Sequence, residues 1–265
     1  MITNAILLAA GFGTRLRPLT DTLPKCLMPV GVGVPLLGFW IKKLANAGVR
    51  QIYINSHFLD YMVEEYLEYL RPLVEANLIE IKETDLLGTM GTVRHIVTTY
   101  DVHETLVMHC DNYTAFDITN ILAAPVEFPV SVAGFYSGTS DSVGRLIVDK
   151  SSRQIVRWIE KDPTQGAGWA SNAIYTFRQS AISHIAQTSG SDLVNDWLIP
   201  ESIQSRNCPA GIIYNTTANI DIGTETALRA AQKQLCKTDF TGFIPAIGTC
   251  GWVENFFAIK QELVS

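Results

Sequence analysis

The alternation of strand-like and helix-like segments in residues 5–110 restricts the fold of this chain more than any other feature of its sequence. Short apolar runs predict strands at residues 5–9, 51–55, 79–82 and 104–110. Apolar residues at helical spacing predict helices between these strands, at residues 35–47, 59–70 and 88–99. Strands that alternate with helices favour βαβ crossovers, and hence a mostly parallel sheet. We therefore expect an α/β fold in which helices flank that sheet.

The pattern changes in the middle of the chain. Strand-like segments separated by turn residues follow one another at residues 129–136, 143–149, 154–159 and 173–177. This succession predicts a small antiparallel β portion laid on the main sheet. Helical patterns return at residues 191–204 and 225–236, and we see no internal repeat or linker. We expect one continuous domain over residues 1–236. The aromatic-rich tail, residues 237–265, then packs on that domain or lies at a subunit contact of a homo-oligomer.

Composition and charge narrow the class of protein. Apolar residues make up 47% of the chain and charged residues 17%, which predicts a well-buried core rather than disorder. The formal charge of −6 leaves no general basic surface for nucleic acid, so any anion site has to be local. No apolar segment approaches the roughly 18 residues of a membrane helix, and residues 1–4 lack the cationic start of a signal peptide. Five scattered cysteines without CxxC spacing predict free thiols, so we expect a cytoplasmic protein without a membrane partner.

The stretch from Leu7 to Gly31, LLAAGFGTRLRPLTDTLPKCLMPVG, is a candidate anion site. It places glycines directly after a predicted strand, where open parallel sheets bind ligands. Glycines let backbone N–H groups approach a phosphate, and Arg15 and Lys25 add positive charge. The stretch does not contain GxxxxGK[ST], and it departs from GxGxxG because Leu16 stands where the third glycine should be. A phosphate-binding loop of a different type is therefore predicted.

The order of residues in this stretch resembles that of a known family. Residues 11–20 read GFGTRLRPLT, and residues 24–30 read PKCLMPV. Together they resemble the hallmark of the nucleotidyltransferases that make NDP-sugars from a nucleoside triphosphate and a sugar 1-phosphate. The resemblance extends over residues 4–235. It implies a Rossmann-like, mostly parallel sheet of the nucleotide-diphospho-sugar transferase type, with the antiparallel portion on the substrate side.

The resemblance also implies two metal ligands. Cys110-Asp111-Asn112 resembles the G-D-N motif that follows the fourth strand in the family, with a cysteine in place of the usual glycine. Asp221 begins a D-I-G-T sequence like the one that supplies the second carboxylate. Two oxygen ligands from distant segments suit Mg²⁺, which keeps coordination places for phosphate and water. We expect Asp111 and Asp221 to bind Mg²⁺.

Three further segments resemble the acceptor-binding motifs of the family. Residues 160–163, EKDP, are similar to E-K-P, whose lysine contacts the sugar phosphate and whose glutamate contacts a sugar hydroxyl. Residues 171–175, SNAIY, are similar to N-A-G-I-Y, whose asparagine binds sugar hydroxyls. Residues 142–144, SVG, fall where relatives have Y-G. The substrate-binding residues that the resemblance implies are Asn112, Gly144, Glu160, Lys161 and Asn172.

A nucleotide-binding set follows from the same resemblance. Residues 83–91, ETDLLGTMG, resemble the base-reading segment E-x-x-P-L-G-T-A-G. Relatives with L-G-T-A-G include guanylyltransferases for mannose 1-phosphate and for a heptose 1-phosphate, which favours GTP as the nucleotide. The implied nucleotide-binding residues are Leu8, Ala9, Ala10, Gly11, Gly13, Thr14, Arg15, Glu83, Gly88, Thr89 and Asp111.

The implied reaction is an in-line attack by a phosphate oxygen of the sugar 1-phosphate on the α-phosphorus of the nucleotide, with release of pyrophosphate. Because two anions must meet, the expected catalytic residues act by positioning and by neutralising charge. They are Arg15, Lys25, Asp111, Lys161 and Asp221. Two alternatives stay open. One is a cytidylyltransferase that acts on a small non-sugar phosphate or phosphonate, such as phosphocholine. The other is a non-catalytic regulatory homologue.

Overall fold

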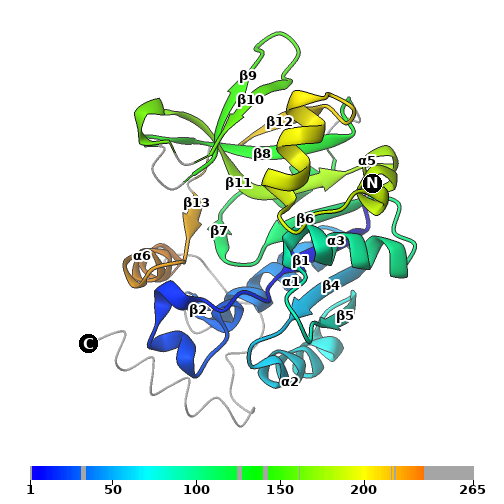
Figure 1. The fold of residues 1–265 in the computed structure, drawn as a ribbon. Coiled ribbons are helices and arrows are strands. Elements are labelled where there is room, and N and C mark those ends of the chain that lie inside the picture. Colours follow the sequence, from blue (N-terminus) through cyan, green and yellow to red (C-terminus); the bar gives the residue numbers. More distant parts are fainter. Residues whose placement is uncertain are drawn as a thin grey trace. The chain divides into compact units, whose positions relative to one another are not determined.

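The computed structural model describes residues 2–30, 34–123, 127–139, 143–160, 162–215, 217 and 219–235. The chain divides into two compact units. Unit 1 comprises Met1–Ile6, Leu87–His109 and Thr114–Asn219, and unit 2 comprises Leu7–Leu86, Cys110–Tyr113 and Ile220–Ser265. The fold is α/β with a mostly parallel central sheet flanked by helices, as the alternating pattern predicted (Figure 1). The expected tail, residues 237–265, lies outside the described residues, so the predicted domain boundary stays a prediction.

Unit 2 contains the end of the first strand and the first two crossovers. Strands β1 (Asn4–Leu8), β4 (Gln51–Ser56) and β5 (Asn77–Lys82) lie in the order β1-β4-β5, and β4 pairs with β5 in parallel. Helix α1 (Leu36–Asn46) connects β1 to β4, and helix α2 (Asp60–Leu70) connects β4 to β5. The apolar face of α1 includes the completely buried Trp40. These strands and helices confirm the predictions for residues 5–82 to within two residues at each end.

The remaining elements of unit 2 are short, apart from its last helix. Strands β2 (Pro29–Val30) and β3 (Val34–Pro35) form a two-stranded ladder, and 3₁₀ turns span Thr14–Leu16, Leu19–Asp21, Lys25–Leu27 and Arg71–Leu73. Strands β7 (Asn112–Thr114) and β13 (Asn219–Asp221) pair with each other at the points where the chain passes between units. Helix α6 (Glu225–Leu235) follows, as predicted.

Unit 1 contains the antiparallel portion that the sequence predicted. Its strands are β6 (Thr105–His109), β8 (Val130–Ser137), β9 (Arg145–Val148), β10 (Ile155–Ile159), β11 (Gly168–Phe177) and β12 (Ala210–Asn215). Strand β11 pairs antiparallel with β6, β8 and β9, and β9 pairs antiparallel with β10. Strand β12 runs parallel to β8. The helical elements are α3 (Gly88–Thr99), α4 (Ile118–Leu122), α5 (Gln179–Gln187), the 3₁₀ turn Pro163–Gln165 and a π-helical segment, Leu193–Gln204.

Several elements of this part were not predicted, for physical reasons. Helix α4 is only five residues long, and β7 and β13 have three residues each, so their periodicity is too short to recognise. Strand β12 exists because it pairs with β8, which lies far away in the sequence. The helix predicted at residues 191–204 is π-helical from Leu193 to Gln204, and Pro200 lies inside it without an N–H to donate.

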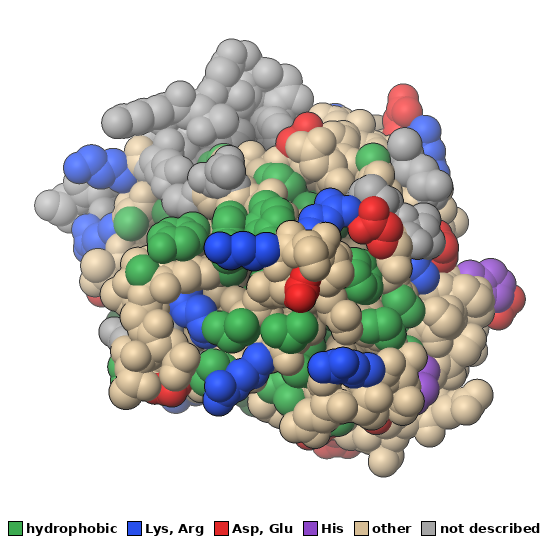
Figure 2. All heavy atoms as spheres, turned by 90° about the horizontal axis from the view of Figure 1, so that it is seen from above, with side chains coloured by type: hydrophobic (Ala, Val, Ile, Leu, Met, Phe, Trp, Pro, Cys, Tyr) green, Lys and Arg blue, Asp and Glu red, His purple; other side chains and the backbone are tan. Residues whose placement is uncertain are grey.

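The core and the surface fit a well-packed protein. The largest completely buried side chains are Trp40, Trp197, Tyr66, Tyr175 and Phe177. On the face seen in Figure 2, apolar side chains are interspersed with Lys and Arg, and Asp and Glu also lie on this face. Among the helices that the structure describes, none is long and apolar enough to cross a membrane.

Candidate active site

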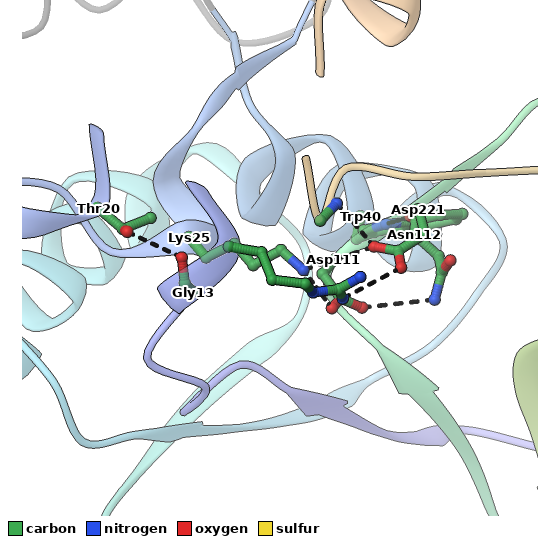
Figure 3. Close-up of polar contacts among 9 residues, drawn as sticks. Gly13, Thr20, Lys25, Trp40, Asp111, Asn112 and Asp221 are labelled. Carbon is green, nitrogen blue, oxygen red and sulfur yellow. Dashed lines mark hydrogen bonds and ion pairs between the residues drawn. The ribbon is translucent and has the colours of Figure 1, made fainter. Parts of the chain in front are cut away.

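The predicted phosphate loop follows β1 and is held in shape by Gly13. This residue has φ +64°, in the left-handed region that favours glycine. A Cβ on Gly13 would lie 2.7 Å from Cγ2 of Thr20, and its carbonyl accepts a hydrogen bond from the Thr20 hydroxyl at 2.9 Å (Figure 3). Gly11, Thr14 and Arg15 are exposed. The loop therefore combines a fixed backbone with groups that a ligand can reach.

Lys25 meets two carboxylates that are distant in the sequence. Its Nζ lies 2.6 Å from Oδ2 of Asp111 and 3.5 Å from Oδ1 of Asp221 (Figure 3). The Lys25 side chain is only 10% exposed, whereas Asp111 is 33% and Asp221 46% exposed. A buried ammonium needs a charged partner, and here it has two. Three of the five predicted catalytic residues thus come together within unit 2.

Backbone contacts place the two aspartates. The Cys110 N–H donates to the Leu8 carbonyl at 3.0 Å, which fixes the residue before Asp111 against the end of β1. The Ile222 N–H donates to the Asp111 carbonyl at 2.9 Å, which links the two aspartate segments directly. Asn112 is buried, and its Nδ2 lies 3.4 Å from Oδ1 of Asp111. Its carbonyl accepts the indole N–H of Trp40 at 2.8 Å.

Arg15 joins the same cluster from the phosphate loop. Its Nη2 lies 3.5 Å from Oδ2 of Asp221, and both side chains are largely open to solvent. The Gly223 N–H donates to Oδ1 of Asp221 at 2.8 Å. A Cβ on Gly223 would lie 2.6 Å from Nη2 of Arg15, so the glycine in the D-I-G-T sequence leaves room for the guanidinium. The contact of Arg15 is exposed and adds little stability, but it keeps a guanidinium fork beside the loop.

The carboxylate pair fits a hard divalent cation. Asp111 and Asp221 already converge on one cationic atom, Nζ of Lys25. Their donors are carboxylate oxygens, which Mg²⁺ prefers. Within the described ranges, no group of three or more His, Cys, Asp or Glu side chains is arranged to hold a metal ion. Asp111 and Asp221 are therefore the residues that could hold a Mg²⁺ ion, and its binding there stays a prediction.

Glu83 lies at the end of β5, in a buried hydrogen-bond chain. Its Oε1 accepts from Nδ2 of Asn55 at 2.9 Å, and Oδ1 of Asn55 accepts the Ala9 N–H at 2.7 Å. Both Asn55 and Glu83 are less than 8% exposed. Asn55 was missed in the sequence analysis, although a polar residue ending the apolar run QIYIN was a usable signal. It connects the predicted base-reading carboxylate to the start of the phosphate loop.

Gly88 and Thr89 lie in unit 1 and have clear structural contacts. Gly88 has φ +75°, and a Cβ there would lie 2.4 Å from the Ser191 carbonyl oxygen. The Thr89 hydroxyl accepts the Leu193 N–H at 2.8 Å. The glycine-started helix therefore packs tightly against residues 191–193. The role of both residues in nucleotide binding stays a prediction.

Two of the predicted acceptor residues of unit 1, Gly144 and Glu160, lie close together. Trp158 donates its indole N–H to Oε1 of Glu160, and a Cβ on Gly144 would lie 2.5 Å from that same oxygen. The Gly144 carbonyl accepts the Ser171 N–H at 3.0 Å. Lys161, the fifth predicted catalytic residue, lies outside the described residues. Three of the motif segments thus meet in space.

The strand that carries Asn172 has an unusual backbone. Ala173 has φ +56°, although alanine disfavours this conformation, and the pairing of β11 with β8 is irregular between Ser171 and Tyr175. Ala173 therefore holds a conformation that glycine usually adopts, and the bend is kept without a glycine. Asn172 is completely buried, and neither polar atom of its side chain has a partner in the described part of the chain. Its contact with substrate stays a prediction.

The cysteines near the site are not nucleophiles. Cys26 and Cys110 are buried free thiols. Burial raises the pKa of Cys26 to about 12 and raises that of Cys110 well above its ordinary value. Both thiols stay protonated near neutral pH, so they serve as small apolar residues in the core.

The sequence matches the family described as "Nucleotidyl transferase" over residues 4–238, and the chain belongs to that family. The mannose-1-phosphate guanyltransferase of Neurospora crassa is 30% identical over 224 residues, which cover 78% of this chain and 55% of that protein. The mannose-1-phosphate guanylyltransferase regulatory subunit alpha of Dictyostelium discoideum is 24% identical over 211 residues, covering 74% and 51%. The chain thus spans about half the length of these curated relatives.

The fold is shared with solved structures. HddC from Yersinia pseudotuberculosis, complexed with GMP-PN, superposes with a TM-score of 0.73 and 20% identity, covering 88% of this chain and 99% of that one. At this identity the likeness shows the fold alone. Together, the family match and the relatives confirm the predicted sugar-1-phosphate nucleotidyltransferase family, whereas the roles of the individual motif residues stay predictions.

Proposed function

We propose that this chain is a Mg²⁺-dependent nucleotidyltransferase that joins a nucleoside triphosphate, preferentially GTP, to a sugar 1-phosphate and releases pyrophosphate. The observation that supports this most strongly is the cluster in which Lys25 contacts both Asp111 and Asp221, with Arg15 beside it. It provides cationic groups for phosphates and oxygen ligands for a metal in one place. The free thiols of Cys26, Cys110 and Cys208 suit an enzyme of the cytoplasm.

Each residue of the cluster has a distinct role in the proposed reaction. Arg15 and the backbone N–H groups of Gly11–Thr14 bind the triphosphate. Lys25 neutralises charge that builds up on the α-phosphate during transfer. Mg²⁺, held by Asp111 and Asp221, would supply further positive charge to the phosphates. Lys161 holds the phosphate of the acceptor.

The transfer step needs no general base. A phosphate oxygen of the acceptor is already ionised near pH 7, and it forms the new bond to the α-phosphorus. The bond from the α-phosphorus to the bridging oxygen of the β-phosphate breaks, and its electron pair leaves with pyrophosphate. The protein therefore accelerates the transfer by neutralising charge and by aligning the two anions.

Glu83 supports GTP as the nucleotide. An ionised carboxylate only accepts hydrogen bonds. The guanine base offers two adjacent donors, N1–H and the 2-amino group, whereas uracil offers a single N–H between two acceptors. The similarity to the mannose-1-phosphate guanyltransferase of Neurospora crassa agrees with this preference. The residues LGT at 87–89 also support GTP, because they resemble the L-G-T-A-G segment of guanylyltransferases.

A regulatory subunit is the second candidate, and the Dictyostelium discoideum relative is the observation that favours it. Such a protein would bind nucleotide or sugar phosphate without turnover. The retention of Arg15, Lys25, Asp111 and Asp221 in one cluster argues for catalysis.

Pyrophosphate release tests the proposal. The assay crosses four nucleoside triphosphates against mannose, glucose and heptose 1-phosphates and phosphocholine, with and without Mg²⁺. We expect one dominant pair, GTP with a sugar 1-phosphate, and loss of turnover in Asp111→Asn and in the absence of Mg²⁺. CTP with phosphocholine as the best pair would replace the proposed substrates. If no pair releases pyrophosphate although the protein binds nucleotide, the result would favour a regulatory subunit.

A further inference from the structure

Trp158 and Glu160 contact each other at the end of β10. The indole Nε1–H of Trp158 donates a hydrogen bond to Oε1 of Glu160. The Trp158 residue is buried at 7% exposure, and Glu160 is half-buried. A buried indole ring is rigid and keeps its N–H pointing in one direction. The more flexible Glu160 side chain is therefore held in place by its neighbour.

Gly144 completes this arrangement. A Cβ at this position would lie 2.5 Å from Oε1 of Glu160 and 2.5 Å from Nε1 of Trp158. Any other residue would therefore displace the hydrogen bond. The Gly144 carbonyl accepts the Ser171 N–H at 3.0 Å, which attaches the cluster to β11. The backbone of Gly144, which leaves room for the contact between Trp158 and Glu160, is thus bonded to β11.

The chemistry of the donor determines what Glu160 can still bind. An indole N–H is uncharged, so it orients the carboxylate without cancelling its charge, as Arg or Lys would. An ionised carboxylate has about four lone-pair positions and only accepts hydrogen bonds. The positions that Trp158 does not use suit a hydroxyl group, which is a donor.

We infer that Trp158 is a positioning residue for the acceptor, because it holds the Glu160 carboxylate where it accepts a hydrogen bond from an acceptor hydroxyl. The inference rests on the proposed function and on the resemblance of residues 160–163 to E-K-P, whose glutamate contacts a sugar hydroxyl. An acceptor with hydroxyl groups gains from this contact, whereas phosphocholine has no hydroxyl to offer.

Trp158→Phe is the test, since it keeps a buried aromatic ring and removes the N–H. Loss of a hydrogen bond to a charged group predicts a rise of about tenfold in the KM for mannose 1-phosphate, or for the sugar 1-phosphate that the panel identifies. We expect the KM for GTP to stay unchanged. Trp169→Phe is the matched control in unit 1, because Trp169 packs against Tyr136 and Tyr214. In a Glu160→Ala background, Trp158→Phe should have no further effect.

The outcomes separate this inference from the proposed function. An unchanged acceptor KM in Trp158→Phe overturns the inference, and so does an undiminished effect in the Glu160→Ala background. If the wild-type protein binds mannose 1-phosphate without turnover, titration calorimetry replaces the kinetic measurement. Weaker binding by Trp158→Phe then supports the inference, while the missing turnover counts against the function alone. Absence of both binding and turnover for every sugar 1-phosphate overturns both.

Discussion

Replacing Lys25 with methionine should strengthen Mg²⁺ binding while it destroys turnover. In the structure the Lys25 ammonium lies 2.6 Å from Asp111 and 3.5 Å from Asp221, so it occupies the position toward which both carboxylates point. A metal ion bound by Asp111 and Asp221 would have to share these oxygens with the ammonium. Methionine keeps an unbranched apolar side chain, one atom shorter than that of lysine, and removes the charge. The two carboxylates are then left facing each other, and a cation between them becomes more favourable.

The magnitude follows from the exposure of the partners. A hydrogen bond to a charged group contributes about 1.5–3 kcal/mol. Asp111 is 33% exposed and Asp221 46%. Solvent screening therefore places the contribution of the Lys25 contacts at or below about 1.5 kcal/mol. About 1.4 kcal/mol corresponds to a tenfold tighter dissociation constant for Mg²⁺. Removal of a cation that stabilises the transferring α-phosphate should lower kcat by about 100- to 1,000-fold.

Titration calorimetry with MgCl₂ measures the first effect, and pyrophosphate release measures the second. Lys42→Met is the matched control, because Lys42 lies on the exposed side of α1 and its ammonium contacts only the Leu73 carbonyl among the contacts described, at 3.4 Å. Neither quantity should change in this variant. Equal or weaker Mg²⁺ binding in Lys25→Met, with the protein still folded by circular dichroism, would refute the view that the ammonium and the metal share the same carboxylates.

Two further predictions concern stability. Ala173→Gly should raise the free energy of unfolding by about 1 kcal/mol, because Ala173 has φ +56°; urea denaturation measures this, and Ala170→Gly on the same strand should instead destabilise. The pKa of Cys26 is raised by burial from 9.0 to about 12, so the folded protein keeps the proton while the unfolded chain loses it above pH 9. The free energy of unfolding should therefore fall between pH 9 and 12, by up to about 1.4 kcal/mol per pH unit from this thiol. If the free energy of unfolding of Cys26→Ala falls with the same slope between pH 9 and 12, the Cys26 thiol is not the cause of the pH dependence.

The sequence predicted the local elements well. The longer strands and helices of residues 5–110 were recognisable because apolar periodicity is a property of neighbouring residues, whereas the two-residue strands β2 and β3 were not predicted. The same holds for the phosphate loop, whose glycine at position 13 is required by its own φ of +64°. The family motifs then named Asp111 and Asp221 as partners, although nothing in their local sequence brings them together.

The tertiary structure alone decided how the side chains converge. That Lys25 bridges two aspartates, that Asn55 links Ala9 to Glu83, and that Trp158 holds Glu160 depends on strand ends, register and rotamers. The alanine at 173 with positive φ could not be foreseen either, since the surrounding sheet imposes that conformation on a residue that disfavours it. Periodicity is a property of a short segment and can be read from the sequence, whereas a site is a set of distances between segments that only the folded chain brings into contact.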